Sequence, residues 1–323
     1  MAKPEERRRR AWVKGIPGAL AEKRESARAT SEDEDRRQRI LSLRSKDRLM
    51  VAHPAQRAFD GTVHEQDPST RFGFRYGERG THGSRSIMLA DLRQLLALTA
   101  VGSAYEDYRV AVMEENVLGK ATASTRLWAW KKLRELYGLD ARLAVFRCFR
   151  QLWEADSQGR PLLAILCACA HDPLLRMSAA VILDAPIEAV VTAEDFRDAI
   201  GVTAPDRFSA KTLRSTGSNL FASWAQSGHL VGGNVRRRAR PVVSPEATAY
   251  ALVLGRLTGS RGPLLFSTFW AALLDAPRET LLDLAAVASQ RGWIDFRRAG
   301  SVVDVGFSKL LTSEEEEALR ESD

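Results

Sequence analysis

The sequence predicts a mainly α-helical protein that also contains two short β-hairpins. Between residues 87 and 201, apolar residues recur at spacings of three and four, and caps and glycine stops separate them into successive helices. Two later segments each combine a helix, a glycine stop and an alternating hairpin. With 45% hydrophobic residues in 323 residues, the chain can bury a substantial core. We therefore expect a helical bundle followed by helix-and-hairpin modules.

Changes in composition divide the chain into five segments. Residues 1–85 hold 20 lysines and arginines against 13 acidic residues and show little apolar periodicity, which indicates a flexible basic arm. The helical bundle is expected over residues 86–190, and six or seven helices joined by short links are expected between residues 87 and 201. The first helix-and-hairpin module follows at residues 191–257, and further helices with a second hairpin at residues 258–311. Residues 312–323 are expected to be a solvated acidic tail.

Aromatic residues alternate with arginines near the end of the arm. Phe72, Phe74 and Tyr76 could stack on nucleic-acid bases while the neighbouring arginines pair with phosphates. The interpretation that we favour is a short strand or a disordered patch that lies against the folded body.

The composition argues against a membrane or secreted protein. The longest apolar run, Pro161–Ala170, is half the length needed to cross a bilayer, and no apolar segment follows the basic N-terminus. Cys148, Cys167 and Cys169 lie in apolar helical sequence at spacings that suit neither a metal nor a disulfide. We expect small buried thiols in a reducing cytoplasm.

The sequence contains no recognisable catalytic, metal-binding or cofactor-binding motif. It has no phosphate-binding loop, no dinucleotide-binding glycine pattern and no zinc-protease helix motif. His171 is expected to be a hydrogen-bonded turn residue, whereas His229 at the start of the first hairpin could contact a phosphate. We therefore expect a protein that is not an enzyme and needs no metal or cofactor. An active site assembled from distant residues remains the alternative.

The segment from Phe208 to Pro245 has the clearest functional pattern. Ser209 is a suitable N-cap, and Gly228 can end the helix that follows it. One face of this helix is apolar, with Leu213, Gly217, Leu220, Phe221 and Trp224. The opposite face has small and hydrogen-bonding groups. A hairpin then follows, with glycines near its turn and a cluster of arginines on one arm.

This combination is typical of a winged helix bound to duplex DNA, in which the helix enters the major groove and the wing contacts the backbone. Solvated arginines and a protein-docking module are the alternatives. The residues expected to contact DNA are Lys211, Arg214, Ser215, Ser218, Asn219, Gln226, Arg236, Arg237, Arg238 and Arg240. Secondary basic positions are Lys120, Arg126, Lys131 and Lys132.

A second hairpin is expected over residues 293–307, about a turn at residues 298–300. It could belong to a second winged helix or pair with the first hairpin. Only Arg297 and Arg298 lie on it, so its capacity to bind DNA is weaker.

Four segments resemble the BrxA-like family of bacteriophage exclusion (BREX) systems, in the family's order and over about residues 87–250. They are Val112–Asp140, with its EENVLGK and STR motifs, Pro161–Leu183, Thr192–Ile200, with its TAEDF motif, and Phe208–Leu230. The basic arm and the region after about residue 250 depart from the family's pattern.

The resemblance implies a mainly helical, non-enzymatic DNA-binding component of a phage-defence system. It also implies a polar helix face on Thr212, Ser215, Thr216 and Asn219. The rival interpretation is an adaptor that assembles larger defence enzymes, such as a methyltransferase, a phosphatase-like protein or an ATPase. An adaptor would dock through an exposed apolar patch, for which Trp128, Phe269 and Trp270 are candidates.

Overall fold

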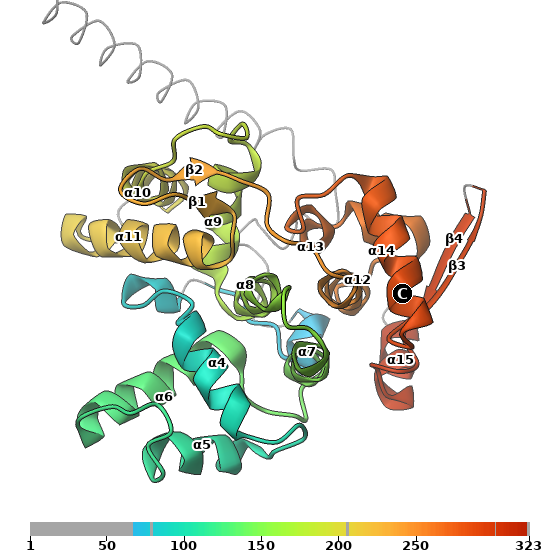
Figure 1. The fold of residues 1–323 in the computed structure, drawn as a ribbon, viewed down its shortest axis with the longest axis horizontal. Helices are drawn as coiled ribbons and strands as arrows, with labels where there is room; N and C mark the ends of the chain where they lie inside the picture. The colour runs from blue at the N-terminus through green and yellow to red at the C-terminus, as the bar shows by residue number, and fades with distance from the viewer. Residues whose placement is uncertain (1–66, 78–79, 205–206, 301, 322–323) are drawn as a thin grey trace, which may run out of the picture. The chain divides into compact units, whose positions relative to one another are not determined.

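The computed structural model describes residues 67–77, 80–204, 207–300 and 302–321, and all of them belong to one compact unit, Val51–Asp323 (Figure 1). Most of these residues are helical, and two small antiparallel hairpins complete the fold. The mainly α-helical fold class with short β-hairpins is therefore confirmed. Residues 1–66 of the predicted basic arm lie outside the described residues.

The helical body includes residues on the N-terminal side of the boundary predicted at residue 86. Two 3₁₀ helices, η2 (Pro68–Phe72) and η3 (Thr81–Gly83), precede the first long helix. Phe72 and Phe74 are buried, and the ring centroid of Phe74 lies 5.5 Å from that of Trp270. Residues 67–77 therefore pack into the core as a 3₁₀ helix followed by a coil, not as a strand.

Three helices follow: α4 (Leu89–Leu98), α5 (Tyr105–Met113) and α6 (Ala123–Tyr137). The Thr122 hydroxyl caps α6 by accepting a hydrogen bond from the Thr125 backbone amide. Gly138 ends α6 with a positive φ of 75°, a conformation that glycine adopts without strain. Thr122 and Gly138 therefore mark the two ends of α6.

Helix α8 lies at the centre of the body and is contacted by α6, α7, α9, α11 and α12 (Figure 1). The neighbouring helices in sequence are α7 (Ala144–Ala155), α8 (Arg160–His171) and α9 (Pro173–Leu183). Every residue of α8 from Leu162 to His171 is buried. Cys148, Cys167 and Cys169 are buried free thiols, as the sequence predicts.

The next elements combine two helices with a minimal hairpin. They are α10 (Ala193–Thr203), α11 (Ala210–Gln226), β1 (Leu230–Val231) and β2 (Arg237–Arg238). Val231 pairs with Arg237 across the antiparallel hairpin, and Val190 forms an antiparallel bridge to Arg237 from the other side. The hydrogen bond from Val191 N to Arg236 O, at 3.1 Å, extends this contact. The segment before α10 therefore flanks β2 on the side opposite β1.

A second set of helices and a longer hairpin follow. They are α12 (Pro245–Leu257), η4 (Gly262–Ser267), α13 (Phe269–Ala272), α14 (Arg278–Gln290), β3 (Asp295–Ala299) and β4 (Val302–Gly306). Strands β3 and β4 are antiparallel, with Asp295 opposite Gly306 and Ala299 opposite Val302. The two hairpins form separate sheets, so among the described residues they do not pair with each other.

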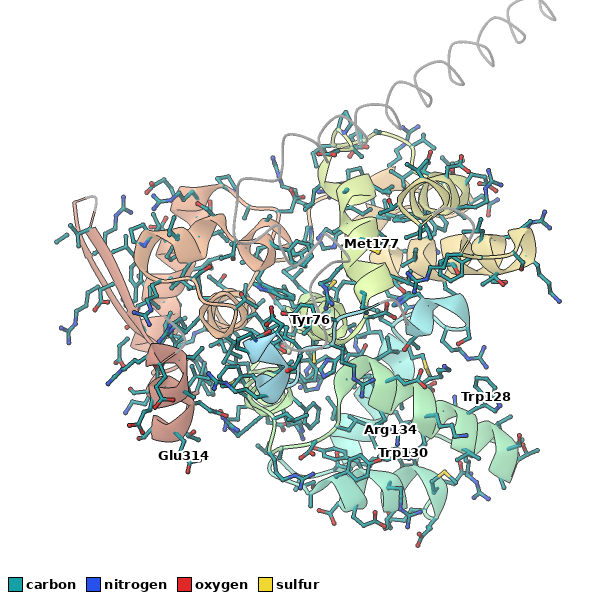
Figure 2. The ribbon with its side chains drawn as sticks, turned by 180° about the vertical axis from the view of Figure 1, so that it is seen from behind. Tyr76, Trp128, Trp130, Arg134, Met177 and Glu314 are labelled. Atoms are coloured by element: carbon teal, nitrogen blue, oxygen red, sulfur yellow. The ribbon has the colours of Figure 1, made fainter. Side chains whose placement is uncertain are left out.

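The acidic C-terminal segment is not simply a solvated tail. Residues Ser313–Arg320 form α15, in which Leu319 is buried. The helix is attached to the body by ion pairs from Arg147 to Glu315, at 2.5 Å, and from Arg256 to Glu316, at 3.3 Å. Glu314 is exposed and extends away from the helix (Figure 2).

Candidate nucleic-acid interface

Helix α11 begins and ends where the sequence predicts. The Ser209 hydroxyl accepts a hydrogen bond from Thr212 N at 3.2 Å, and Gly228, with a φ of 88°, follows the end of the helix. Gly217 faces α10 so closely that a Cβ atom there would lie 2.6 Å from the carbonyl oxygen of Ala193. Glycine at this position therefore sets the close crossing of α10 and α11.

The N-terminal part of α11 has an exposed polar face. Lys211, Arg214, Ser215 and Ser218 are all exposed, as predicted from the sequence. None of these four side chains forms a hydrogen bond or ion pair with another described residue. The face therefore offers two cations and two hydroxyl groups to a partner.

Asn219 and Gln226 do not belong to this exposed face. The Asn219 side-chain amide donates to the carbonyl oxygen of His82 at 2.9 Å. The Gln226 amide oxygen accepts from Leu89 N, and its nitrogen donates to the Ser86 hydroxyl, each at 3.0 Å. The prediction that these two residues read bases is wrong for the structure as it stands, because their polar groups hold residues 82–89.

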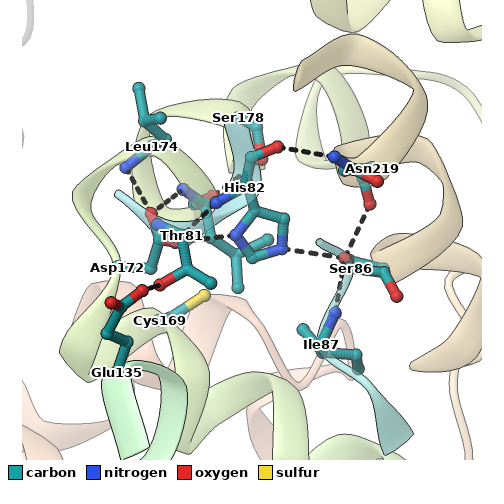
Figure 3. Close-up of polar contacts among 12 residues, drawn as sticks. Thr81, His82, Ser86, Ile87, Glu135, Cys169, Asp172, Leu174, Ser178 and Asn219 are labelled. Carbon is teal, nitrogen blue, oxygen red and sulfur yellow. Dashed lines mark hydrogen bonds and ion pairs between the residues drawn. The ribbon is translucent and has the colours of Figure 1, made fainter. Parts of the chain in front are cut away.

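A buried polar network continues from this contact (Figure 3). His82 lies between Asp172 and Ser223, with Nδ1 2.8 Å from the carboxylate and Nε2 2.8 Å from the hydroxyl. Burial alone would raise the pKa of Asp172, but the charge of His82 and the hydrogen bonds that the carboxylate accepts hold the pKa below its usual value.

Aspartate, histidine and serine are also the residue types of hydrolase catalytic triads, but here all three side chains lie in the interior of the protein. Asp172, His82 and Ser223 each have 0% of their surface exposed. The Ser223 oxygen is also occupied, because it accepts from Ile87 N at 3.0 Å and lies 2.7 Å from the carbonyl oxygen of Asn219. With no surface open to a substrate, the network is suited to hold η3, α9 and α11 together.

The four arginines of the first hairpin have different surroundings. Arg237 and Arg240 are exposed. Arg236 is half-buried, with its guanidinium carbon 4.9 Å from the centroid of the Phe221 ring on α11. Nη1 of Arg236 is buried without a hydrogen-bond partner in the described structure. Stacking of Arg236 on Phe221 joins the hairpin to α11.

Arg238 is a structural residue, and its predicted contact with DNA is wrong. Only 1% of its side chain is exposed, and Nε donates to the carbonyl oxygen of Ile182 at 2.8 Å. Nη2 forms an ion pair with Asp275 at 2.7 Å. The alternation of a strand places Arg238 on the buried face of the hairpin and Arg237 on the exposed face.

His229 is also structural, so the phosphate contact considered for it is wrong. The ring is fully buried, with Nε2 3.0 Å from the carbonyl oxygen of Leu273 and Nδ1 2.8 Å from the Ser227 hydroxyl. Burial lowers the pKa of His229 to about 3, so the ring is neutral near pH 7. His171, at the end of α8, is buried with a pKa lowered to about 4, again chiefly by burial.

Some of the secondary basic positions form ion pairs within the protein. Most of the polar helix face that the family resemblance implies is also buried or hydrogen-bonded. Lys120 pairs with Asp91 and Lys132 with Glu135, each at 2.7 Å, whereas Lys131 is exposed on α6. Thr216 is buried, and the Thr212 hydroxyl lies 2.9 Å from that of Ser209. Of the implied polar face, Ser215 alone is exposed.

The sequence reasoning missed the role of residues 81–89, because it assigned the first five of them to the arm. Asp172 caps α9, and its Oδ1 accepts from Leu174 N at 2.9 Å. Its other oxygen accepts from Thr81 N at 2.6 Å. No local spacing signals a contact between residues so far apart in the sequence.

No protein-family model and no curated protein sequence matches this chain. Within the described residues, no cluster of histidine, cysteine or acidic side chains is arranged to hold a metal ion. Likewise, none of the described helices is both long enough and apolar enough to cross a membrane.

Proposed function

We propose that residues 173–240 form a winged helix that binds duplex DNA, with α11 as the recognition helix and the β1–β2 hairpin as the wing. The observation that carries this proposal is the order and pairing of the elements. Along the chain, α9 is followed by the extended segment at Val190 and then by α10, α11, β1 and β2. In space, β2 lies between β1 and the segment at Val190 and pairs with both. This order matches a helix-turn-helix completed by a three-stranded wing.

The exposed face of α11 supports contact with a DNA groove. Ser215 and Ser218 are small, so the helix backbone can approach base edges closely and their hydroxyl groups can donate or accept hydrogen bonds there. Lys211 and Arg214 lie on the same exposed face and would contact phosphates at the groove edge.

The hairpin supplies the second cationic contact. From His229 to Pro245 the chain has four arginines and no acidic residue. With Arg238 committed to Asp275, we assign Arg236, Arg237 and Arg240 to the DNA backbone. Five phosphate contacts by α11 and the hairpin would give a slope of about −4.5 for log K against log salt concentration.

The resemblance to BrxA-like proteins extends this proposal to a biological role. We propose a non-enzymatic DNA-binding component of an anti-phage defence system, acting in the cytoplasm on double-stranded DNA. Larger defence enzymes, such as a methyltransferase, a phosphatase-like protein or an ATPase, are the protein partners expected if the chain acts as an adaptor.

The proposal is tested by fluorescence polarisation with a random 25-base-pair duplex at several salt concentrations. The variants are Lys211→Ala/Arg214→Ala on α11 and Arg237→Ala/Arg240→Ala on the hairpin. Each should weaken binding and reduce the magnitude of the salt slope by about 2. Arg142→Ala/Lys309→Ala is the matched control, because it removes two exposed cations from turns outside residues 173–240. A parent slope near zero, or unchanged binding by both test variants, would refute DNA binding by this module.

One observation favours the adaptor as a second candidate function. Trp128 is 50% exposed and Leu127 is 40% exposed on α6, and Figure 2 labels Trp128 on this helix. Phe269 and Trp270, the other two candidates, are buried at 7% and 3% exposure and belong to the core. If α6 docks a partner protein, Trp128→Ser should abolish co-purification with that partner and leave DNA affinity unchanged. Retained co-purification would exclude Trp128 as the docking residue.

A further inference from the structure

A short segment that leads into α4 is bonded along one side of the proposed recognition helix, α11. We call residues 81–89 the strap. Asn219, Ser223 and Gln226 lie four and three residues apart, so they form one stripe along α11. All three side chains bond to the strap: Asn219 to His82 O, Ser223 to Ile87 N and Gln226 to Leu89 N.

The strap is also held from the side opposite α11. The Asp172 carboxylate accepts from the backbone amides of Thr81 and His82, and the Thr81 hydroxyl donates to Glu135 on α6 at 3.2 Å. Figure 3 shows these contacts converging on η3. Fixed at both sides, the strap has a defined position beside α11.

Helical geometry places the strap at one edge of the exposed face of α11. Successive residues of a helix turn by about 100°. Measured about the helix axis from Asn219, Ser215 therefore lies at about 40°, Ser218 at about 100° and Phe221 at about 160°, all in the same rotational direction. Phe221 supports Arg236 of the hairpin. The exposed face is thus flanked by the strap on one side and by the hairpin on the other.

The strap brings one cation to this edge. Arg85 is exposed, and it lies between His82 and Ser86, both of which bond to α11. Its guanidinium forms no ion pair or hydrogen bond with a described residue. Arginine binds a phosphate through parallel hydrogen bonds, and those bonds need a fixed position.

We propose that Arg85 contacts a phosphate of the DNA backbone, on the side of α11 opposite the hairpin. Asn219 is the positioning residue that holds the strap for this contact. This inference rests on the proposed DNA-binding function, and it assigns to the site a residue that precedes α11 by more than a hundred positions.

The test compares Arg85→Ala and Arg85→Lys with the full-length parent in the same polarisation assay. Arg85→Ala should weaken binding by roughly fivefold at low salt and reduce the magnitude of the slope by about 1, equally on unrelated duplex sequences. Arg85→Lys should keep the parent slope because it keeps the charge. Arg142→Ala, whose side chain is 86% exposed, is the matched single-arginine control and should bind as the parent does.

A second comparison tests the role of Asn219. In an Asn219→Ala background, Arg85→Ala should weaken binding by less than it does in the parent, because the strap then lacks its bond to α11 at His82 O and holds Arg85 less firmly. Equal effects in the two backgrounds would overturn the positioning role. Thermal unfolding of Arg85→Ala should match that of the parent, which separates a lost contact from a damaged fold.

The outcomes separate this inference from the proposed function. If the α11 and hairpin variants weaken binding and Arg85→Ala binds with the parent affinity and slope, Arg85 does not contact DNA and the winged-helix proposal stands. If the parent itself shows no salt-dependent binding, the proposed function fails, and this inference fails with it.

Discussion

Arg237 and Arg238 are neighbours on β2, but their side chains lie on opposite faces of the hairpin. One is exposed, and the other is 1% exposed and ion-paired with Asp275. The same contrast separates Ser218, which is exposed, from Asn219, which bonds to the strap. At the scale of single residues, the groups that pack against a side chain decide whether its polar atoms are exposed.

His229 gives a prediction for pH dependence. The folded state holds its pKa at about 3, whereas an unfolded chain has a value near 6.5. Between pH 6.5 and pH 3 the unfolded state binds a proton that the folded state does not bind. The contribution of His229 to stability is therefore fully present above about pH 6.5 and is lost as the pH decreases toward 3. We expect a loss of about 2 kcal/mol from this group between pH 7 and pH 5.

Urea unfolding of the parent and of His229→Gln at pH 7 and pH 5 measures this effect. The variant should be less stable at pH 7, because glutamine cannot reproduce both ring contacts. It should also lose less stability on acidification, although His171 still contributes with its own lowered pKa. An identical pH dependence in the two proteins would show that His229 is not held neutral.

At the scale of elements, caps determine where a helix begins and ends, whereas packing determines which of its side chains are buried. The predicted cap at Ser209 and the predicted stop at Gly228 are both present, because each acts on backbone groups within a few residues. The buried side of α11 was less predictable. It includes Thr216 and Ser223, two polar residues that neighbouring elements cover.

The crossing of α10 and α11 gives a prediction at this scale. In Gly217→Ala, the new Cβ would lie 2.6 Å from Ala193 O and 3.0 Å from Arg197 N, so the two helices must separate. Alanine is the better helix former by about 1 kcal/mol, but overpacking costs about 1–3 kcal/mol. We expect a net loss of about 1–2 kcal/mol in the free energy of unfolding.

Gly233→Ala in the hairpin is the matched control. Nothing lies within 4 Å of a Cβ at that position, so the free energy of unfolding should change by less than about 0.5 kcal/mol. Urea denaturation measures both variants. Equal stability of Gly217→Ala and the parent would mean that the helices do not cross as closely as the structure shows.

At the scale of the whole molecule, contacts distant in sequence join the N-terminal residues to the body. Phe74 packs against Trp270, the strap bonds to α11, and the Arg176 guanidinium donates to the carbonyl oxygen of Arg75. Helix α15 is fixed to α7 and α12 in the same way. A boundary at residue 86 would cut through this packing.

A truncation series tests the boundary. A chain of residues 86–323 lacks the buried side chains of Phe72, Phe74 and His82 and leaves Asp172 without its partner. Burying one phenylalanine side chain contributes about 1.5–3 kcal/mol to stability. We therefore expect the free energy of unfolding to fall by several kcal/mol and the unfolding temperature to be much lower. A chain of residues 67–323 keeps every described contact and should unfold near the temperature of the parent. Equal unfolding of both truncations would contradict the packing of residues 67–85.

The sequence by itself determined the mainly helical class, the two hairpins, the buried cysteines and the exposed cations at the start of α11. These properties follow from periodicity, caps and turn residues that act locally. Only the tertiary structure decided that Arg238, His229 and Asn219 have structural roles and that the strap belongs to the body. Their partners lie 37 to 137 residues away, and no local pattern encodes a contact that depends on how separate helices pack.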